Sequence, residues 1–114
     1  MNLKSIHTIY FIGIGGIGMS AIARYFLASG KHVGGFDKTA SSITSSLQDL
    51  GADIHFEDAV EQISMPFLDA QQTLVVYTPA ISEDHRELNY FNQHGFQVLK
   101  RAEILGEITK NTFC

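Results

Sequence analysis

The chain has 114 residues, of which 45% are hydrophobic and 18% charged, and its net charge at pH 7 is −4. These values suit one globular domain with a single core. They argue against a nucleic-acid interface, because Lys100-Arg101 is the only adjacent basic pair, and the lone cysteine, Cys114, excludes an internal disulfide or a multi-cysteine metal site.

The N-terminal part of the chain has no targeting or membrane pattern. Its uncharged run, residues 8–23, is shorter than the ~20 residues of a membrane-spanning helix, and glycines interrupt it. The same glycines break the apolar core that a signal peptide needs. The five histidines lack the spacing of a metal site and are expected at the surface or in loops. We therefore expect a cytoplasmic protein with no metal site.

Short apolar runs alternate with stretches of helical periodicity along the chain. The first run, residues 8–12, is apolar at nearly every position, which is typical of a strand buried on both faces. Strands are expected at residues 8–12, 32–36, 53–56, 73–77 and 96–99. Helices are expected from Ile17 to Gly30, from Ser41 or Ser42 to Gly51, over 58–64, from Asp84 to Gly95 and over 101–108.

Several of these helices have identifiable ends. A serine at 41 or 42 can cap the second helix, and Pro66 should stop the short helix over 58–64. Asp84 and Glu87 have the spacing of a capping box at the helix that follows. The apolar faces are expected to bury Ile43, Leu47 and Leu50 in the second helix and Ile104, Leu105 and Ile108 in the last.

Alternation of strands and helices with short connections predicts an α/β fold. The expected architecture is a Rossmann-like three-layer sandwich, with a five-stranded parallel sheet in the order 3-2-1-4-5, helices on both faces and right-handed crossovers. In such a sheet, ligands bind at the carboxyl ends of the strands, beside the point where the strand order switches. The first strand lies at that point, so a ligand site is expected at the connection that follows it.

The connection after the first strand is rich in glycine, with Gly13, Gly15, Gly16 and Gly18 close together. Glycine lets backbone N–H groups approach a ligand closely. The helix that follows directs its free N–H groups and positive dipole end at the same place. The pattern therefore predicts a diphosphate-binding loop. The alternative is a tight turn that packs a helix against a strand and binds nothing, because a lone G-x-G-x-x-G is weak evidence.

Asp37 lies 19 residues after Gly18, at the predicted end of the second strand. A carboxylate in that place can accept hydrogen bonds from ribose hydroxyls. The alternative is a solvated loop acid beside Lys38. The loop and Asp37 together predict a nucleotide, but they do not separate NAD from other nucleotides.

Three stretches resemble the Mur ligases of bacterial peptidoglycan synthesis. The run FIGIGGIGMSAIARYFLASGKHVGGFD, residues 11–37, contains the family pattern G-x-G-G-x-G-M from Gly13 to Met19. VVYTPAI, residues 75–81, is similar to the family's apolar strand ending in Ser/Thr-x-Ala-Ile. KRAEILGEI, residues 100–108, is similar to its R-A-E-[MI]-L helix. The resemblance spans about the whole chain.

The resemblance implies that residues 1–114 form a single N-terminal domain that binds the UDP part of UDP-N-acetylmuramate. Backbone N–H groups of the loop would hold the diphosphate, Asp37 would meet the nucleoside, and the stretch after the fourth strand would line the cleft. No catalytic or metal-binding residue is implied in this domain. The residues implied in binding are Gly13, Gly15, Gly16, Ile17, Gly18, Met19, Ser20, Asp37, Thr78, Pro79, Ala80 and Ile81.

The resemblance also implies a parent enzyme that joins L-alanine to UDP-N-acetylmuramate by ATP-dependent amide formation. The family places ATP and magnesium on a second domain that starts with a P-loop, and no P-loop sequence occurs here. We therefore expect that the ATP-binding central domain and the C-terminal domain, the partners of this domain in the parent protein, are absent from this chain. The chain alone is expected to be inactive.

Three alternatives remain open at this point. The first is the NAD-binding domain of a dehydrogenase, which Asp37 suits equally well. The second is a regulatory module that senses a nucleotide and acts by contact with another chain, although nothing in the sequence requires it. The third is the murein peptide recycling ligase, a sibling within the family. The family often has a histidine after its third strand, where this chain has Glu57-Asp58, so a nucleotide contact by that histidine is not carried over. Arg101 begins the last predicted helix, where it could reach an anion or a partner domain, although a surface arginine is the favoured interpretation.

Overall fold

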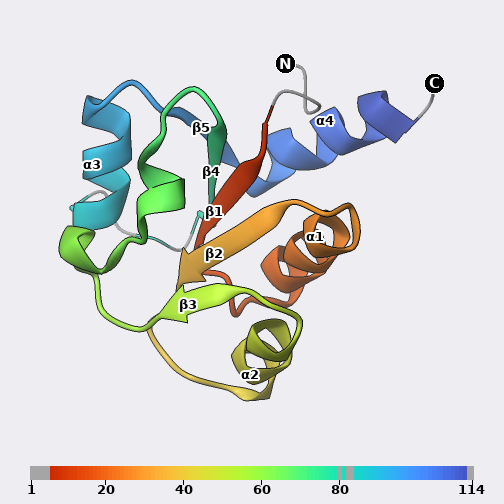
Figure 1. The fold of residues 1–114 in the computed structure, drawn as a ribbon, viewed down its shortest axis with the longest axis horizontal. Coiled ribbons are helices and arrows are strands. Elements are labelled where there is room, and N and C mark those ends of the chain that lie inside the picture. Colours follow the sequence, from red (N-terminus) through yellow and green to blue (C-terminus); the bar gives the residue numbers. More distant parts are fainter. Residues whose placement is uncertain (1–5, 80, 82–83, 113–114) are drawn as a thin grey trace.

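The computed structural model describes residues 6–79, 81 and 84–112 of the chain. Five parallel strands form one sheet in the order β3-β2-β1-β4-β5, which confirms the predicted order (Figure 1). The strands are β1 (Thr8–Ile12), β2 (His32–Phe36), β3 (Asp53–His55), β4 (Thr73–Tyr77) and β5 (Gln97–Lys100). The helices are α1 (Ile17–Ala28), α2 (Ser42–Asp49), α3 (Arg86–Gln93) and α4 (Arg101–Thr112), with two short 3-10 helices, η2 (Val60–Gln62) and η3 (Met65–Leu68).

Helices cover both faces of the sheet, as expected for three layers (Figure 1). Ile9 and Phe11 of the central strand β1 pack with α1, α2 and α4 on one face. Tyr10 and Ile12 of the same strand pack with α3 and η3 on the other. Every residue of β1 is buried, because successive side chains of a strand point to opposite faces and both faces are covered.

Three local expectations are wrong in detail. Leu50 is 56% exposed, because α2 ends at Asp49 and the buried face of that helix is Thr44 and Leu47. Pro66 does not end a helix but lies near the start of η3, where a missing N–H has no cost. Leu105 is 48% exposed, whereas Ile104 of the same helix is fully buried.

The capping box predicted for α3 is also wrong. The N-cap of α3 is His85 rather than Asp84, and its Nδ1 accepts a long hydrogen bond of 3.4 Å from the backbone N–H of Leu88. His85 is 8% exposed, but it lies in the loop before α3, as expected. The expectation that all histidines lie at the surface or in loops fails at His55, which belongs to β3 and has a side chain that is only 12% exposed. Glu87 is fully buried and its contacts are with other parts of the chain.

Candidate functional site

The glycine loop lies where the sequence predicts it, between the carboxyl end of β1 and the start of α1 (Figure 1). The N–H groups of Gly13 and Ile14 both donate to the carbonyl of Phe36 at the end of β2, at 2.8 and 3.0 Å. Gly13 has φ +93°, and a Cβ atom there would lie 2.5 Å from Cγ2 of Thr78. Backbone conformation and space both require glycine at this position.

The start of α1 has the properties of an anion site. Its N-cap is Gly16, which has no side chain to accept hydrogen bonds from the first-turn N–H groups, and no acidic residue lies in the first turn. Ile17 is 83% exposed, so this end of the helix opens to solvent. The side chains of Met19 and Ser20 are buried, and the Ser20 hydroxyl donates to the Ile17 carbonyl at 2.9 Å. Only backbone groups of these residues are therefore placed for an anion.

Asp37 lies directly after β2 and reaches the glycine loop. Its Oδ1 accepts a hydrogen bond from Gly15 N–H at 3.0 Å, and its Oδ2 accepts one from Thr39 N–H at 3.1 Å. A carboxylate thus already binds one backbone donor of the loop. The free donors that remain for a ligand anion lie further along, in the first turn of α1.

The stretch after β4 forms the opposite wall of the loop. Thr78 N–H donates to the Ile12 carbonyl at 3.3 Å, and Ile81 N–H donates to the Thr78 carbonyl at 3.1 Å. The side chains of Thr78 and Ile81 stand nearest to Gly13, while Pro79 is exposed. Ala80, which the sequence also predicts in the site, lies outside the described residues. Gly13, Gly15, Asp37, Thr78 and Ile81 are thus brought together.

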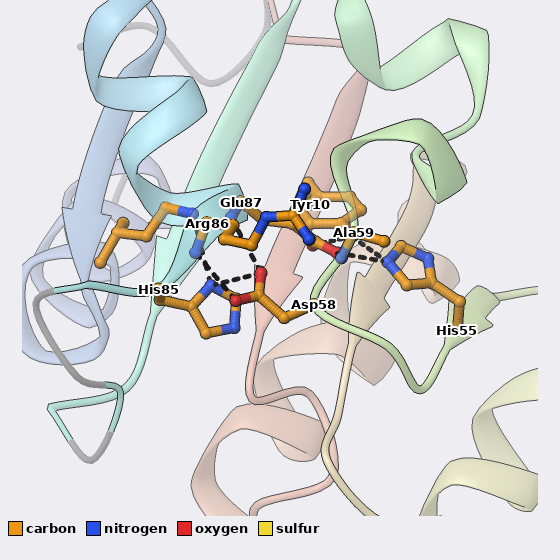
Figure 2. Close-up of polar contacts among 8 residues, drawn as sticks. Tyr10, His55, Asp58, Ala59, His85, Arg86 and Glu87 are labelled. Carbon is orange, nitrogen blue, oxygen red and sulfur yellow. Dashed lines mark hydrogen bonds and ion pairs between the residues drawn. The ribbon is translucent and has the colours of Figure 1, made fainter.

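A buried carboxylate, Glu87, joins α3 to β1 and β3 (Figure 2). Glu87 accepts hydrogen bonds from the Tyr10 hydroxyl at 2.5 Å and from Ala59 N–H at 3.1 Å, and its Oε2 lies 2.6 Å from His55 Nε2. Burial, reinforced by the charge of Glu87, raises the pKa of Tyr10 far above its usual value. The Tyr10 hydroxyl therefore stays protonated and keeps donating to Glu87.

A second carboxylate caps α3 from a distant loop (Figure 2). Asp58 accepts hydrogen bonds from the N–H groups of Arg86 and Glu87 at 2.9 and 3.0 Å, and lies 3.3 Å from His85 Nδ1. From the sequence we placed Glu87 in a local capping box and noted Asp58 only as a departure from the family pattern, so neither long-range set of contacts was predicted. Together they hold the N-terminus of α3.

Two other classes of site find no support in the part of the chain that the structure describes. No group of three His, Cys, Asp or Glu side chains there is arranged to hold a metal ion. No helix there is long and apolar enough to cross a membrane.

Comparison with known proteins places the chain in a family. Residues 8–112 match the sequence profile described as the Mur ligase family, catalytic domain. The chain belongs to the Mur ligase family. This finding confirms the resemblance carried by the three sequence stretches.

Curated Mur ligases resemble the chain over nearly its full length. It is 57% identical to the UDP-N-acetylmuramate–L-alanine ligase of Parabacteroides distasonis over 98% of this chain and 24% of that protein. It is 55% identical to the enzyme of the same name from Flavobacterium psychrophilum, over 100% of this chain and 25% of that protein. The chain thus spans about a quarter of the length of these relatives.

Solved structures of Mur ligases share the fold. The crystal structure of UDP-N-acetylmuramate–alanine ligase from Thermotoga maritima superimposes with a TM-score of 0.80 at 29% identity, over 91% of this chain and 23% of that one. A murein peptide ligase from Psychrobacter arcticus superimposes with a TM-score of 0.75 at 22% identity, over 89% of this chain and 20% of that one. The second comparison shows the fold alone.

Proposed function

We propose that this chain is the sugar-nucleotide-binding domain of an enzyme that joins L-alanine to UDP-N-acetylmuramate. The main support is structural: the glycine loop, the uncapped start of α1 and Asp37 lie together at the carboxyl edge of the sheet. Relatives that carry the name of that enzyme are 57% and 55% identical to this chain. The murein peptide recycling ligase has weaker support, since its solved representatives are 20% and 22% identical.

The contacts of Asp37 suggest how the ligand would be oriented. Its carboxylate already accepts a hydrogen bond from the N–H of Gly15. The negative charge of that carboxylate would repel a phosphate placed beside Gly15. The diphosphate therefore belongs on the first-turn N–H groups of α1, at Ile17, Gly18 and Met19, where the helix dipole favours negative charge. The remaining lone pairs of the Asp37 carboxylate would then accept hydrogen bonds from the hydroxyl groups of a ribose bound near the end of β2.

The role of the domain in this proposal is positioning. Residues 13–20, Asp37 and the stretch from Thr78 to Ile81 would fix the UDP part, so that the rest of the substrate is presented to the reacting partners in one orientation. ATP and magnesium, which would activate the substrate carboxylate for amide formation, belong in this proposal to the part of the enzyme that its relatives have beyond this region. The cytoplasm is the compartment proposed for this reaction.

Calorimetric titration of the 114-residue chain tests this function. We expect saturable binding of UDP-N-acetylmuramate, competition by UDP, and no competition by NAD at equal concentration. Amide NMR signals of residues 13–20 and of Asp37 should shift during the titration. No heat and no shifts at millimolar ligand would contradict the proposal, and displacement by NAD would restore the dehydrogenase alternative.

A further inference from the structure

Arg101 lies against the start of α1. It is the first residue of α4 and follows directly on the carboxyl end of β5. A Cβ atom placed on Gly18 would lie 2.6 Å from Nη1 of Arg101, 3.2 Å from its Cδ and 3.4 Å from its Cζ. The guanidinium therefore occupies the space that any side chain at position 18 would need.

The position of this guanidinium is informative, because Cα–Cβ bonds in a helix tilt toward the N-terminus. Nη1 of Arg101, 2.6 Å from the Cβ position of Gly18, therefore lies alongside the first turn of α1. Two sources of positive potential thus meet, the guanidinium and the helix end. The first turn of α1 contains no acidic residue to offset them.

Among the residues that the structure describes, Arg101 takes part in no ion pair. It stands at a groove of about 390 Å³ between α1 and α4, and none of the other lining residues carries a charge. These are Gly18, Ala21, Ile22, Tyr25, Leu105 and Ile108.

We propose that Arg101 is a diphosphate contact of this site. The inference rests on the proposed function, since it adds one residue to the same ligand. A guanidinium presents two parallel N–H donors that match two phosphate oxygens. With the N–H groups of Ile17 to Met19 on one side and Arg101 on the other, the diphosphate is bound between a helix end and a cation. The absence of a side chain at Gly18 leaves room for the guanidinium in this position.

Matched charge substitutions on the 114-residue chain test the proposal. R101Q removes the cation, and R24Q is the control, since Arg24 is an exposed residue of α1 whose bond to Ser46 lies away from the loop. We expect R101Q to weaken binding of UDP and UDP-N-acetylmuramate by about tenfold or more, and R24Q to change it less than twofold. R101K, which keeps the charge but not the paired donors, should fall between R101Q and wild type.

Uridine separates loss of a phosphate contact from loss of structure. Binding of uridine, followed by NMR shifts at millimolar concentration, should be unchanged in R101Q because uridine has no phosphate. UDP binding that is equally tight in R101Q and wild type overturns the assignment of Arg101 and leaves the proposed function standing. Equal weakening of uridine and UDP also overturns it. Failure of the wild-type chain to bind UDP overturns the proposed function itself.

Discussion

At the scale of single residues, Gly13 shows how the candidate site depends on the absence of a side chain. Its φ of +93° lies in the left-handed region, and the Thr78 methyl group fills the space beside it. Gly30 has a similar φ of +83° with nothing within 4 Å of its Cβ position. Alanine substitutions at the two glycines therefore separate the free-energy cost of a positive φ from the cost of a steric clash.

We expect G13A to lower the free energy of unfolding by roughly 2–4 kcal/mol, because strain and overpacking add. G30A should cost only about 1 kcal/mol, from strain alone. T78S removes the crowding methyl group, so G13A in a T78S background should cost clearly less than in wild type. Urea unfolding measures all four variants. Equal costs for G13A and G30A would show that Thr78 does not crowd the loop.

Tyr10 gives a prediction for alkaline pH. At pH 8, Y10F should lower the free energy of unfolding by about 1–3 kcal/mol, because it leaves a buried carboxylate oxygen of Glu87 without its donor. The pKa of Tyr10 is raised in the folded state above its ordinary value of 10.0. The unfolded state therefore loses the phenol proton first, and the stabilising contribution of Tyr10 is complete below pH 10 and falls above it.

The stability difference between wild type and Y10F should therefore shrink by about 1 kcal/mol between pH 8 and pH 11. Denaturant unfolding of both proteins at the two pH values measures it. The groups facing Tyr10 are the same in both proteins, so their titration largely cancels in the difference. A difference that stays constant or grows with pH would contradict the raised pKa.

At the scale of elements, the α2 and α3 N-termini show what local sequence can predict. Ser41 caps α2 through Thr44, only three residues away, and the structure confirms a serine cap there. At α3, the N-cap residue His85 is joined by Asp58, which lies 28 residues before Arg86 and 29 before Glu87 and accepts hydrogen bonds from both of their N–H groups. The local spacing fits a capping box at Asp84, but the Glu87 carboxylate forms hydrogen bonds with Tyr10 and His55 instead. No local pattern contains those partners.

The remote cap is testable with two neighbouring acids. D58N should lower the free energy of unfolding by roughly 1–2 kcal/mol, because it weakens the charge-assisted bonds to the first N–H groups of α3. E57Q makes the same change of charge at an exposed residue and should cost less than 0.5 kcal/mol. Thermal unfolding monitored by circular dichroism compares them. Similar losses in both variants would mean that Asp58 acts only through net charge.

At the scale of the whole molecule, the sequence predicts the sheet because strand–helix alternation allows few arrangements. Among these arrangements is the observed strand order β3-β2-β1-β4-β5. In this order, Gly13, Asp37 and Thr78 lie together at the carboxyl edge of the sheet. The packing of Arg101 on Gly18 was not predicted, since it joins residues of two helices that lie 83 positions apart, a relation that no local pattern contains. Periodicity likewise placed Leu105 in the core, although only Ile104 of that pair is buried.

A crystal structure of the chain with UDP-N-acetylmuramate is the most direct test of the central claim, that the glycine loop and the start of α1 bind a diphosphate. We predict phosphate oxygens within hydrogen-bond distance of the N–H groups of Ile17 to Met19 and of the Arg101 guanidinium. The ribose should meet Asp37. A ligand bound at the amino-terminal edge of the sheet, or a diphosphate without contact to α1, would contradict the claim.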